Sequence, residues 1–207
     1  FDVIRKLRKL LKEKAIGHTG TLDPLATGVL VMCVGKATKL AQDIEAQSKT
    51  YIATLEFGYK TDTLDITGEI LEKKEYKAPT KEEFLEACKG FIGNIEQIPP
   101  MYSAIKINGE KLYDLARKGI EVERKPRPVT ISSIDLIQLD EKGAIIKCTV
   151  SKGTYIRTLI DDIGEKLGTF ATMSDLLRQE VGNYHINKSF KLSDIEKMVE
   201  ANDFSFL

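Results

Sequence analysis

The sequence predicts an α+β fold with a mixed, largely antiparallel central sheet flanked by helices. Segments with the apolar pattern of strands, such as residues 49–57 and 129–139, outnumber the segments with helical spacing. The two kinds follow one another irregularly, whereas a parallel α/β sheet alternates them. With 207 residues and a hydrophobic share of 42%, the chain is long enough to bury a core without disulfide bonds.

Apolar spacing places the individual elements along the chain. We expect helices at residues 1–14, 37–44, 80–90, 110–119 and 157–168, and a last helix from residue 193. We expect strands at residues 29–34, 49–57, 69–76, 129–139, 144–150 and 173–181. In the first helix, Phe1, Ile4 and Leu7 fall on one face.

Local signals fix several of these boundaries. Capping boxes at residues 80–83 and 193–196 each place a hydroxyl three residues before a glutamate, which opens a helix. Gly119 and Gly168 end two helices, because glycine adopts the left-handed conformation that follows a helix. The pair Pro99-Pro100 excludes a central strand at that point.

Composition narrows the class of protein. Lys plus Arg equals Asp plus Glu at 31 each, so any binding to a polyanion has to come from local basic clusters. The isolated Cys33, Cys88 and Cys148 predict reduced thiols in the core. Only His18 and His185 are available, which argues against a metal site of the usual His/Cys kind. No apolar run reaches membrane-spanning length and no leader is recognisable, so we expect a cytoplasmic protein.

One short loop carries the most distinctive polar residues. Residues 17–24 read GHTGTLDP, in which two glycines and a proline predict a fixed, non-helical conformation. Asp23 precedes Pro24 and is biased toward an extended backbone. The loop therefore either displays an acid for chemistry or merely starts a turn with Asp23.

Two further polar residues begin regular elements. Tyr51 starts the strand at residues 49–57, and Arg157 starts the helix that ends at Gly168. Each also has a purely structural interpretation. Tyr51 can be a half-buried aromatic residue of a strand, and Arg157 can be a surface cation. Between them, residues 58–68 form a polar loop that carries Asp62 and Asp65.

Basic residues gather in two places. The helix at residues 1–14 carries them around its polar face, either as a solvated surface or as a strip that binds phosphate. The second group lies in residues 106–127 and comprises Lys106, Lys111, Arg117, Lys118, Arg124, Lys125 and Arg127. Each of these residues is either a phosphate contact or plain surface charge.

Four longer stretches together resemble the bacterial TruB family of pseudouridine synthases. They read GHTGTLDPLATGVL, KTYIATLEFGYKTDTLDITGE, QIPPMYSAIKINGEKLYDLARKG and KGTYIRTLIDDIGEKLG, in the order that the family has them. The resemblance covers residues 1–184, nearly the whole chain. It implies a pseudouridine synthase-like fold and isomerisation of a uridine in the T-loop of transfer RNA.

The resemblance assigns roles residue by residue. Asp23 matches the catalytic aspartate, Tyr51 the tyrosine that stacks on the target base, and Arg157 the arginine that pairs with the aspartate. Contacts with RNA are expected from His18, Tyr155, Leu177, Lys125 and Arg127. The reaction is an isomerisation, so we expect no metal and no other cofactor. The expected partner is the T stem-loop of tRNA, and we expect a monomer without an obligatory protein partner.

The sequence departs from the family at both ends. The Lys-Pro-x-Gly-x-Thr-Ser strand that opens the family is absent, and so is its small C-terminal RNA-binding domain, so we expect a fragment. We expect residues 1–207 to form a single catalytic domain, in which residues 97–128 are an insertion that contacts RNA. The alternative is a non-catalytic RNA-binding or tRNA-folding module on the same fold. A third reading, a subunit that acts with a guide RNA and accessory proteins, is weaker because such relatives carry long basic extensions.

Overall fold

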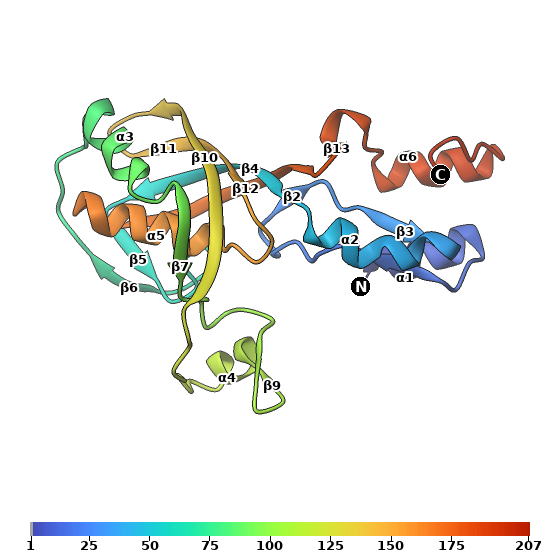
Figure 1. Ribbon diagram of the computed structural model, residues 1–207, viewed down its shortest axis with the longest axis horizontal. Helices are drawn as coiled ribbons and strands as arrows, with labels where there is room; N and C mark the ends of the chain where they lie inside the picture. The colour runs from blue at the N-terminus through green and yellow to red at the C-terminus, as the bar shows by residue number, and fades with distance from the viewer. Residues whose placement is uncertain (1) are drawn as a thin grey trace. The chain divides into compact units, whose positions relative to one another are not determined.

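The computed structural model describes residues 2–207 and divides into two compact units (Figure 1). The first unit combines the chain up to Thr50 with Arg178–Leu207, and the second unit is Tyr51–Leu177. The chain passes from one unit to the other within strand β4 (Lys49–Phe57) and again within strand β12 (Ala171–Val181). Phe1, which we expected on the face of the first helix, lies outside the described residues.

Each unit has its own set of helices and strands. Besides the ends of β4 and β12, the first unit holds α1 (Asp2–Leu11), β1 (Ile16–His18), β2 (Thr27–Gly28), β3 (Met32–Val34), η1 (Gly35–Leu40), α2 (Ala41–Ala46), β13 (Tyr184–His185), η2 (Ile186–Lys188) and α6 (Leu192–Glu200). The second unit holds β5 (Tyr59–Thr61), β6 (Ile70–Lys73), α3 (Lys81–Lys89), β7 (Gly93–Gln97), β8 (Lys106–Ile107), β9 (Glu110–Lys111), α4 (Leu112–Arg117), β10 (Arg127–Leu139), β11 (Gly143–Val150) and α5 (Ile156–Leu167).

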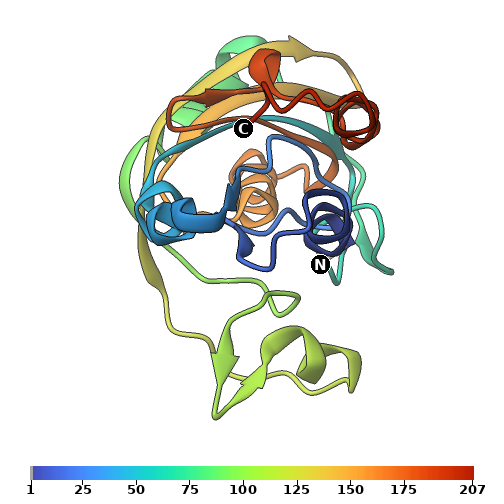
Figure 2. The same cartoon turned by 90° about the vertical axis from the view of Figure 1, so that its right-hand side faces the viewer.

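The second unit is built on a sheet with the strand order β12-β4-β11-β10-β7. Strand β10 pairs antiparallel with both β11 and β7. Along β4, Ala53, Leu55 and Phe57 are buried, as the period-2 pattern predicted. Helix α5 runs along one face of this sheet, which curves around it in Figure 2. The core side chains Leu159 and Ile160 come from α5 and are fully buried.

Local chemistry explains where α3 and α5 begin and end. The Thr80 hydroxyl accepts a hydrogen bond from the Glu83 amide at 3.2 Å, and the Glu83 carboxylate accepts one from the Thr80 amide at 2.7 Å. This is the predicted capping box, which satisfies two backbone donors at the start of α3. At the C-terminal end of α5, Gly168 has φ 71° and ends the helix in the left-handed conformation.

Between β7 and β10 the chain leaves the sheet and forms a small lobe, visible at the bottom of Figure 1. It contains the β8–β9 hairpin, in which Lys106 pairs with Lys111, and helix α4. Leu112 and Leu115 are buried in it. This lobe occupies the expected insertion at residues 97–128, and we call it the insertion.

The first unit has a separate core. Strands β1 and β3 pair antiparallel, and β13 pairs with the end of β12. Val29, Cys33, Ile44 and Val181 form its buried cluster.

All three cysteines of the chain are buried and free, as predicted. Burial raises the pKa of the Cys148 thiol to about 12, so it is a core residue rather than a nucleophile.

The structure corrects three of the predicted elements. Residues 29–34 are no continuous strand, because the backbone of Val29 bonds to Arg178 while only Met32–Val34 pairs with β1. The first helix ends at Leu11, where Lys12 takes the left-handed φ of 51°. The last helix begins before Ser193, since α6 includes the half-buried Leu192. Its N-cap is Lys191, which makes no side-chain cap bond, so the predicted capping box there is wrong.

Candidate active site

In the first unit, Asp23 lies on a loop that a network of backbone bonds holds. The Asp23 carbonyl accepts from the Ala26 amide at 2.9 Å, which closes a turn with Pro24 at its second position. On the same loop, His18 Nδ1 accepts from the Gly20 amide at 3.2 Å. Asp23 itself is half-buried. Asp23 therefore starts a turn, as one reading of the sequence predicted, whereas a catalytic role of its carboxylate stays a prediction.

A residue that the sequence analysis passed over anchors this loop. The Arg178 guanidinium donates from Nε to the Val29 carbonyl at 2.7 Å. It also donates from Nη1 to the Thr21 carbonyl at 3.3 Å and from Nη2 to the Gly20 carbonyl at 3.2 Å. Arg178 is only 2% exposed. The strand also carries Asp175 and Glu180, so its sequence did not single out Arg178. Burial does so, because a buried arginine needs several acceptors.

In the second unit, Tyr51 stands near the start of β4 and is half-buried. It shares a face of the strand with the buried Ala53 and Leu55. Leu177, also half-buried, lies on the neighbouring strand β12. Tyr51 therefore lies on the same face of β4 as two core side chains and remains partly accessible.

Arg157 opens α5 and is 4% exposed, so it is no surface cation. Its Nη1 donates to the Thr63 carbonyl at 2.7 Å, and its Nη2 donates to the Tyr102 carbonyl at 2.9 Å. The guanidinium plane is thus oriented by two carbonyls from separate loops. An arginine held in this way presents its charge in one direction.

Asp65, on the loop before β6, supplies a negative charge beside Arg157. Its Oδ2 lies 3.8 Å from Arg157 Nε. Its Oδ1 accepts hydrogen bonds from the Thr63 hydroxyl at 2.9 Å and the Thr67 amide at 2.9 Å. Asp65 is 6% exposed. The sequence showed only a polar loop here, because nothing in it tells that this carboxylate meets a buried arginine.

The insertion is tied to the same helix start. The Gln97 side chain donates to the Tyr155 carbonyl at 3.0 Å and accepts from the Tyr155 amide at 2.8 Å. Tyr155 lies two residues before Arg157 in the sequence. The Tyr102 hydroxyl donates to Asp62 at 2.9 Å, and this bond raises the pKa of Tyr102. Gln97 and Tyr102, which make these bonds, both lie at the base of the insertion. The backbone around Tyr155 and Arg157 is therefore set by residues 97–102.

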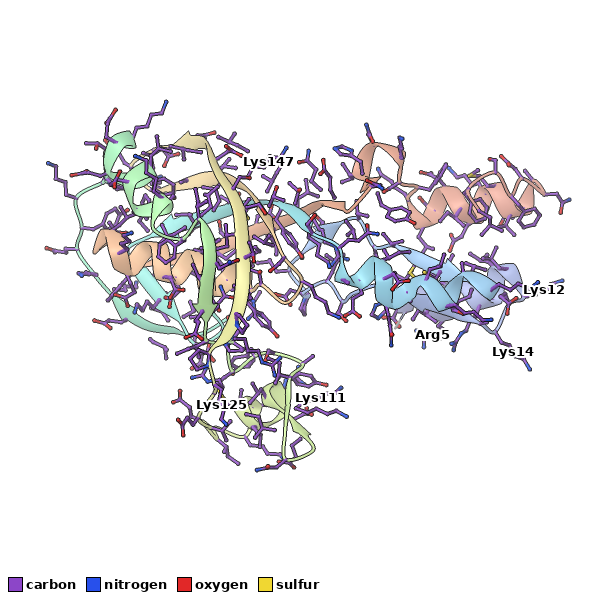
Figure 3. The ribbon with its side chains drawn as sticks, in the orientation of Figure 1. Arg5, Lys12, Lys14, Lys111, Lys125 and Lys147 are labelled. Carbon is purple, nitrogen blue, oxygen red and sulfur yellow. The ribbon has the colours of Figure 1, made fainter. Side chains whose placement is uncertain are left out.

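Basic side chains of the insertion divide into structural and exposed ones. Arg124 donates to the Pro99 carbonyl at 3.3 Å and to Glu121 at 3.0 Å, which holds the two legs of the insertion together. Lys125 and Arg127 are exposed instead. Figure 3 shows Lys111 and Lys125 on this lobe. Lys125 and Arg127 are therefore the cations that suit phosphate groups, whereas Lys111 is half-buried and donates to the Tyr113 hydroxyl at 2.9 Å.

The predicted site residues are divided between the two units. The first unit carries His18 and Asp23, and the second carries Tyr51, Lys125, Arg127, Tyr155, Arg157 and Leu177. Within the second unit, the structure brings Tyr155 and Arg157 together at one helix end and Tyr51 and Leu177 onto neighbouring strands. The pairing of Asp23 with Arg157 stays a prediction.

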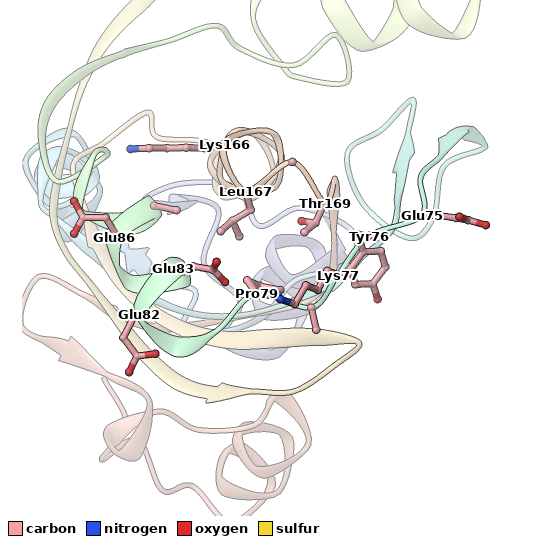
Figure 4. Close-up of a pocket in the computed structure, with 13 residues that line it drawn as sticks. Glu75, Tyr76, Lys77, Pro79, Glu82, Glu83, Glu86, Lys166, Leu167 and Thr169 are labelled. Atoms are coloured by element: carbon pink, nitrogen blue, oxygen red, sulfur yellow. The ribbon is translucent and has the colours of Figure 1, made fainter.

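A cavity of about 920 Å³ lies elsewhere in the second unit (Figure 4). Four glutamates line it together with Lys77, Lys166 and the end of α5. Two of these glutamates are already engaged, Glu83 in the capping box and Glu86 with Lys89. None of the predicted site residues lines this cavity, so it is not the candidate active site.

Two family models match the chain. The model of the TruB family pseudouridylate synthase N-terminal domain matches residues 8–156. The model of the tRNA pseudouridylate synthase B C-terminal domain matches residues 157–205. The chain belongs to the TruB family of pseudouridylate synthases. The resemblance that the four sequence stretches indicated is thereby confirmed.

Curated relatives in this family share much of the sequence. The tRNA pseudouridine synthase B of Fusobacterium nucleatum is 59% identical over 186 residues, which are 90% of this chain and 64% of that protein. The protein of the same name from Clostridium kluyveri is 47% identical over 196 residues, 95% of this chain and 68% of that protein. The chain thus spans about two thirds of the length of the curated relatives it matches.

Solved structures agree on the fold. A chain of the crystal structure of a Cbf5-Nop10-Gar1 complex superimposes with a TM-score of 0.75 at 26% identity, over 99% of this chain and 53% of that one. A chain from the structure of an H/ACA RNP bound to a substrate RNA containing 2′-deoxyuridine gives 0.72 at 23% identity, over 99% of this chain and 52% of that one. The predicted α+β pseudouridine synthase fold is confirmed. Among residues 2–207, none of the helices has the length and apolar character of a membrane span.

Proposed function

We propose that this protein isomerises a uridine in the T-loop of tRNA to pseudouridine, with Asp23 as the catalytic carboxylate. The N1–C1′ bond of the nucleotide breaks, the uracil turns, and a C5–C1′ bond forms. The hydrogen on C5 leaves and N1 gains one, so the product has the atoms of the substrate. The observation that carries the proposal is the family match along residues 8–205, which includes Asp23, Tyr51 and Arg157 in their motifs.

The three residues have chemically distinct roles in this proposal. Asp23 acts as nucleophile or base, for which an ionised carboxylate on a fixed turn is suited. Arg157 keeps that carboxylate charged and aimed, because its planar fork makes charge-assisted contacts in a defined direction. Tyr51 stacks on the uracil after the nucleotide has left the RNA stack, and its hydroxyl takes or relays the C5 proton.

RNA contacts surround these residues. His18 fills the place that the flipped base leaves, Leu177 and Tyr155 border the base, and Lys125 and Arg127 contact phosphates from the exposed side of the insertion. The reaction in this form uses no cofactor. We expect the protein to work as a monomer in the cytoplasm.

The test is incubation with an RNA that consists of the T stem-loop of tRNA, followed by chemical detection of pseudouridine. We expect one modified uridine in the loop and none in the stem. RNA binding without any pseudouridine would instead support the non-catalytic RNA-binding or tRNA-folding module. Modification that requires an added guide RNA would support the guide-dependent subunit.

A further inference from the structure

Arg178 bonds to both ends of the loop that carries Asp23. We define the Asp23 loop as residues 20–29. At its start, the Arg178 guanidinium donates to the Gly20 and Thr21 carbonyls. At its end, the same guanidinium donates to the Val29 carbonyl, and the Val29 amide donates to the Arg178 carbonyl at 2.8 Å. One residue of β12 thus closes the loop through its side chain and its backbone.

At the end of the Asp23 loop, the backbone of Gly28 lies close to the backbone of Arg178. Gly28 has φ 108°, and a Cβ atom there would lie 2.2 Å from the Arg178 carbonyl oxygen. Only glycine permits this approach. Gly28 and Val29 can therefore lie against the backbone of Arg178, which brings the Val29 carbonyl within reach of the guanidinium.

The middle of the loop is not packed into the core, although Thr27–Gly28 pairs with β12 as strand β2. No residue from Thr21 to Gly28 is buried, whereas Val29 and Arg178 are 4% and 2% exposed. The loop therefore has no apolar core of its own, and segments with few buried contacts open most easily. The hydrogen bonds of Arg178 at its two ends leave the Asp23–Ala26 turn at its apex.

We propose that Arg178 is a positioning residue that fixes the Asp23 loop, and with it the Asp23 carboxylate, for isomerisation. This inference rests on the proposed function. Arginine is required because its three nitrogens reach three carbonyls, whereas a lysine has one nitrogen and cannot span them. A displacement of about 1 Å at a reacting group lowers a rate by about a hundredfold.

The test compares Arg178→Lys, which keeps the charge, with Arg178→Met, which keeps the length without a buried charge and so provides a second variant if the lysine fails to fold. Arg8→Lys is the matched control, because the exposed Arg8 donates to the Ile16 carbonyl in the same unit. Each protein is measured for single-turnover product formation on the T stem-loop RNA, for RNA affinity and for amide hydrogen exchange.

We expect the rate of product formation to be about a hundredfold lower in both Arg178 variants, and the RNA affinity to stay within about threefold of the parent. We expect faster exchange confined to residues 20–29, and a control that matches the parent.

A parent-like rate in a folded Arg178 variant overturns the positioning role. So does faster exchange spread evenly over the first unit, because that is the result of a general loss of stability. If the parent itself makes no pseudouridine, the proposed function fails, and the exchange experiment alone then decides whether Arg178 fixes the loop. Unchanged exchange at residues 20–29 overturns the proposal in that case as well.

Discussion

In the second unit, Asp65 Oδ2 lies 3.8 Å from Arg157 Nε, and both side chains are almost completely buried. The remaining nitrogens of Arg157 donate to carbonyls of Thr63 and Tyr102. Asp65 is itself held by the Thr63 hydroxyl and the Thr67 amide. A buried charge of this kind is stable only while its acceptors and its counter-charge stay in place.

Replacing Asp65 by asparagine should therefore weaken both stability and activity. Asparagine keeps the shape but removes the negative charge beside Arg157. We expect the free energy of unfolding to fall by about 3 kcal/mol, the lower end of the range for loss of one partner of a buried pair. Urea denaturation measures this change. The exposed Glu72 of β6 provides a control, since Glu72→Gln should change stability by less than about 0.5 kcal/mol. Equal effects of the two substitutions would contradict a special role for Asp65.

Asp23→Asn should abolish isomerisation and leave RNA binding nearly intact. Asparagine has the size of aspartate without its nucleophilic or basic oxygen. Product formation and RNA affinity are measured in parallel, with the exposed Asp43→Asn in the same unit as the control. A rate within about tenfold of the parent, which is about 1.4 kcal/mol of barrier, would remove Asp23 from the catalytic role.

Tyr51→Phe should separate stacking from proton transfer. The ring stays, so binding of the flipped uracil should survive, because stacking is worth about 1–3 kcal/mol per base. The hydroxyl is lost, so single-turnover formation of product should slow by about a hundredfold or more. Tyr59→Phe is the control, because the Tyr59 hydroxyl donates to the nearby Glu56 at 2.8 Å and Tyr59 is not among the predicted site residues. If Tyr51→Phe turns over like the parent while Tyr51→Ala fails, Tyr51 is a stacking platform and nothing more.

RNA binding should depend on salt through the exposed cations of the insertion. Removing Lys125 and Arg127 together should lower the slope of log affinity against log salt by about 1 to 2, since each phosphate contact releases a counterion. Arg124 is kept, because its bonds to Pro99 and Glu121 maintain the insertion. The control pair is Lys81→Ala with Lys89→Ala on α3. An equal slope in both double variants would assign Lys125 and Arg127 to ordinary surface.

Asp162 on α5 should make the free energy of unfolding larger at acid pH than at neutral pH. Burial, together with the neighbouring Asp161, raises the pKa of Asp162 to about 6, and Lys60 offsets this only in part. The unfolded value is about 3.9. Between these two values the folded state binds more protons than the unfolded one, so stability falls as pH rises through that window.

Asp162→Asn should consequently raise the free energy of unfolding at pH 7.5 by about 1 kcal/mol and flatten its dependence on pH between about 4 and 6. Urea denaturation across that range measures the effect. The exposed Asp135→Asn on β10 should leave the slope unchanged. A slope that survives in Asp162→Asn would show that another group causes it.

Much of the fold was predictable from local patterns. The strand at residues 49–57 matches the observed β4, because alternation of apolar residues directly encodes a half-buried strand. The box of Thr80 and Glu83 and the stop at Gly168 were also predictable, since each acts within a few residues of itself. The pattern at Ser193 failed. There the helix begins one residue earlier, at Leu192, and its N-cap Lys191 makes no side-chain cap bond, so the local hydroxyl-glutamate pattern did not set the boundary.

The sequence by itself determined the α+β class, the family, and the residue types expected to act, which are Asp23, Tyr51 and Arg157. Only the tertiary structure decided what holds them. It buried Arg157 against Asp65, tied Tyr155 to Gln97, and placed Arg178 at both ends of the Asp23 loop. These contacts join residues that are far apart along the chain. A buried guanidinium is stable wherever folding gathers enough carbonyls and carboxylates around it, and no local pattern specifies which ones those are.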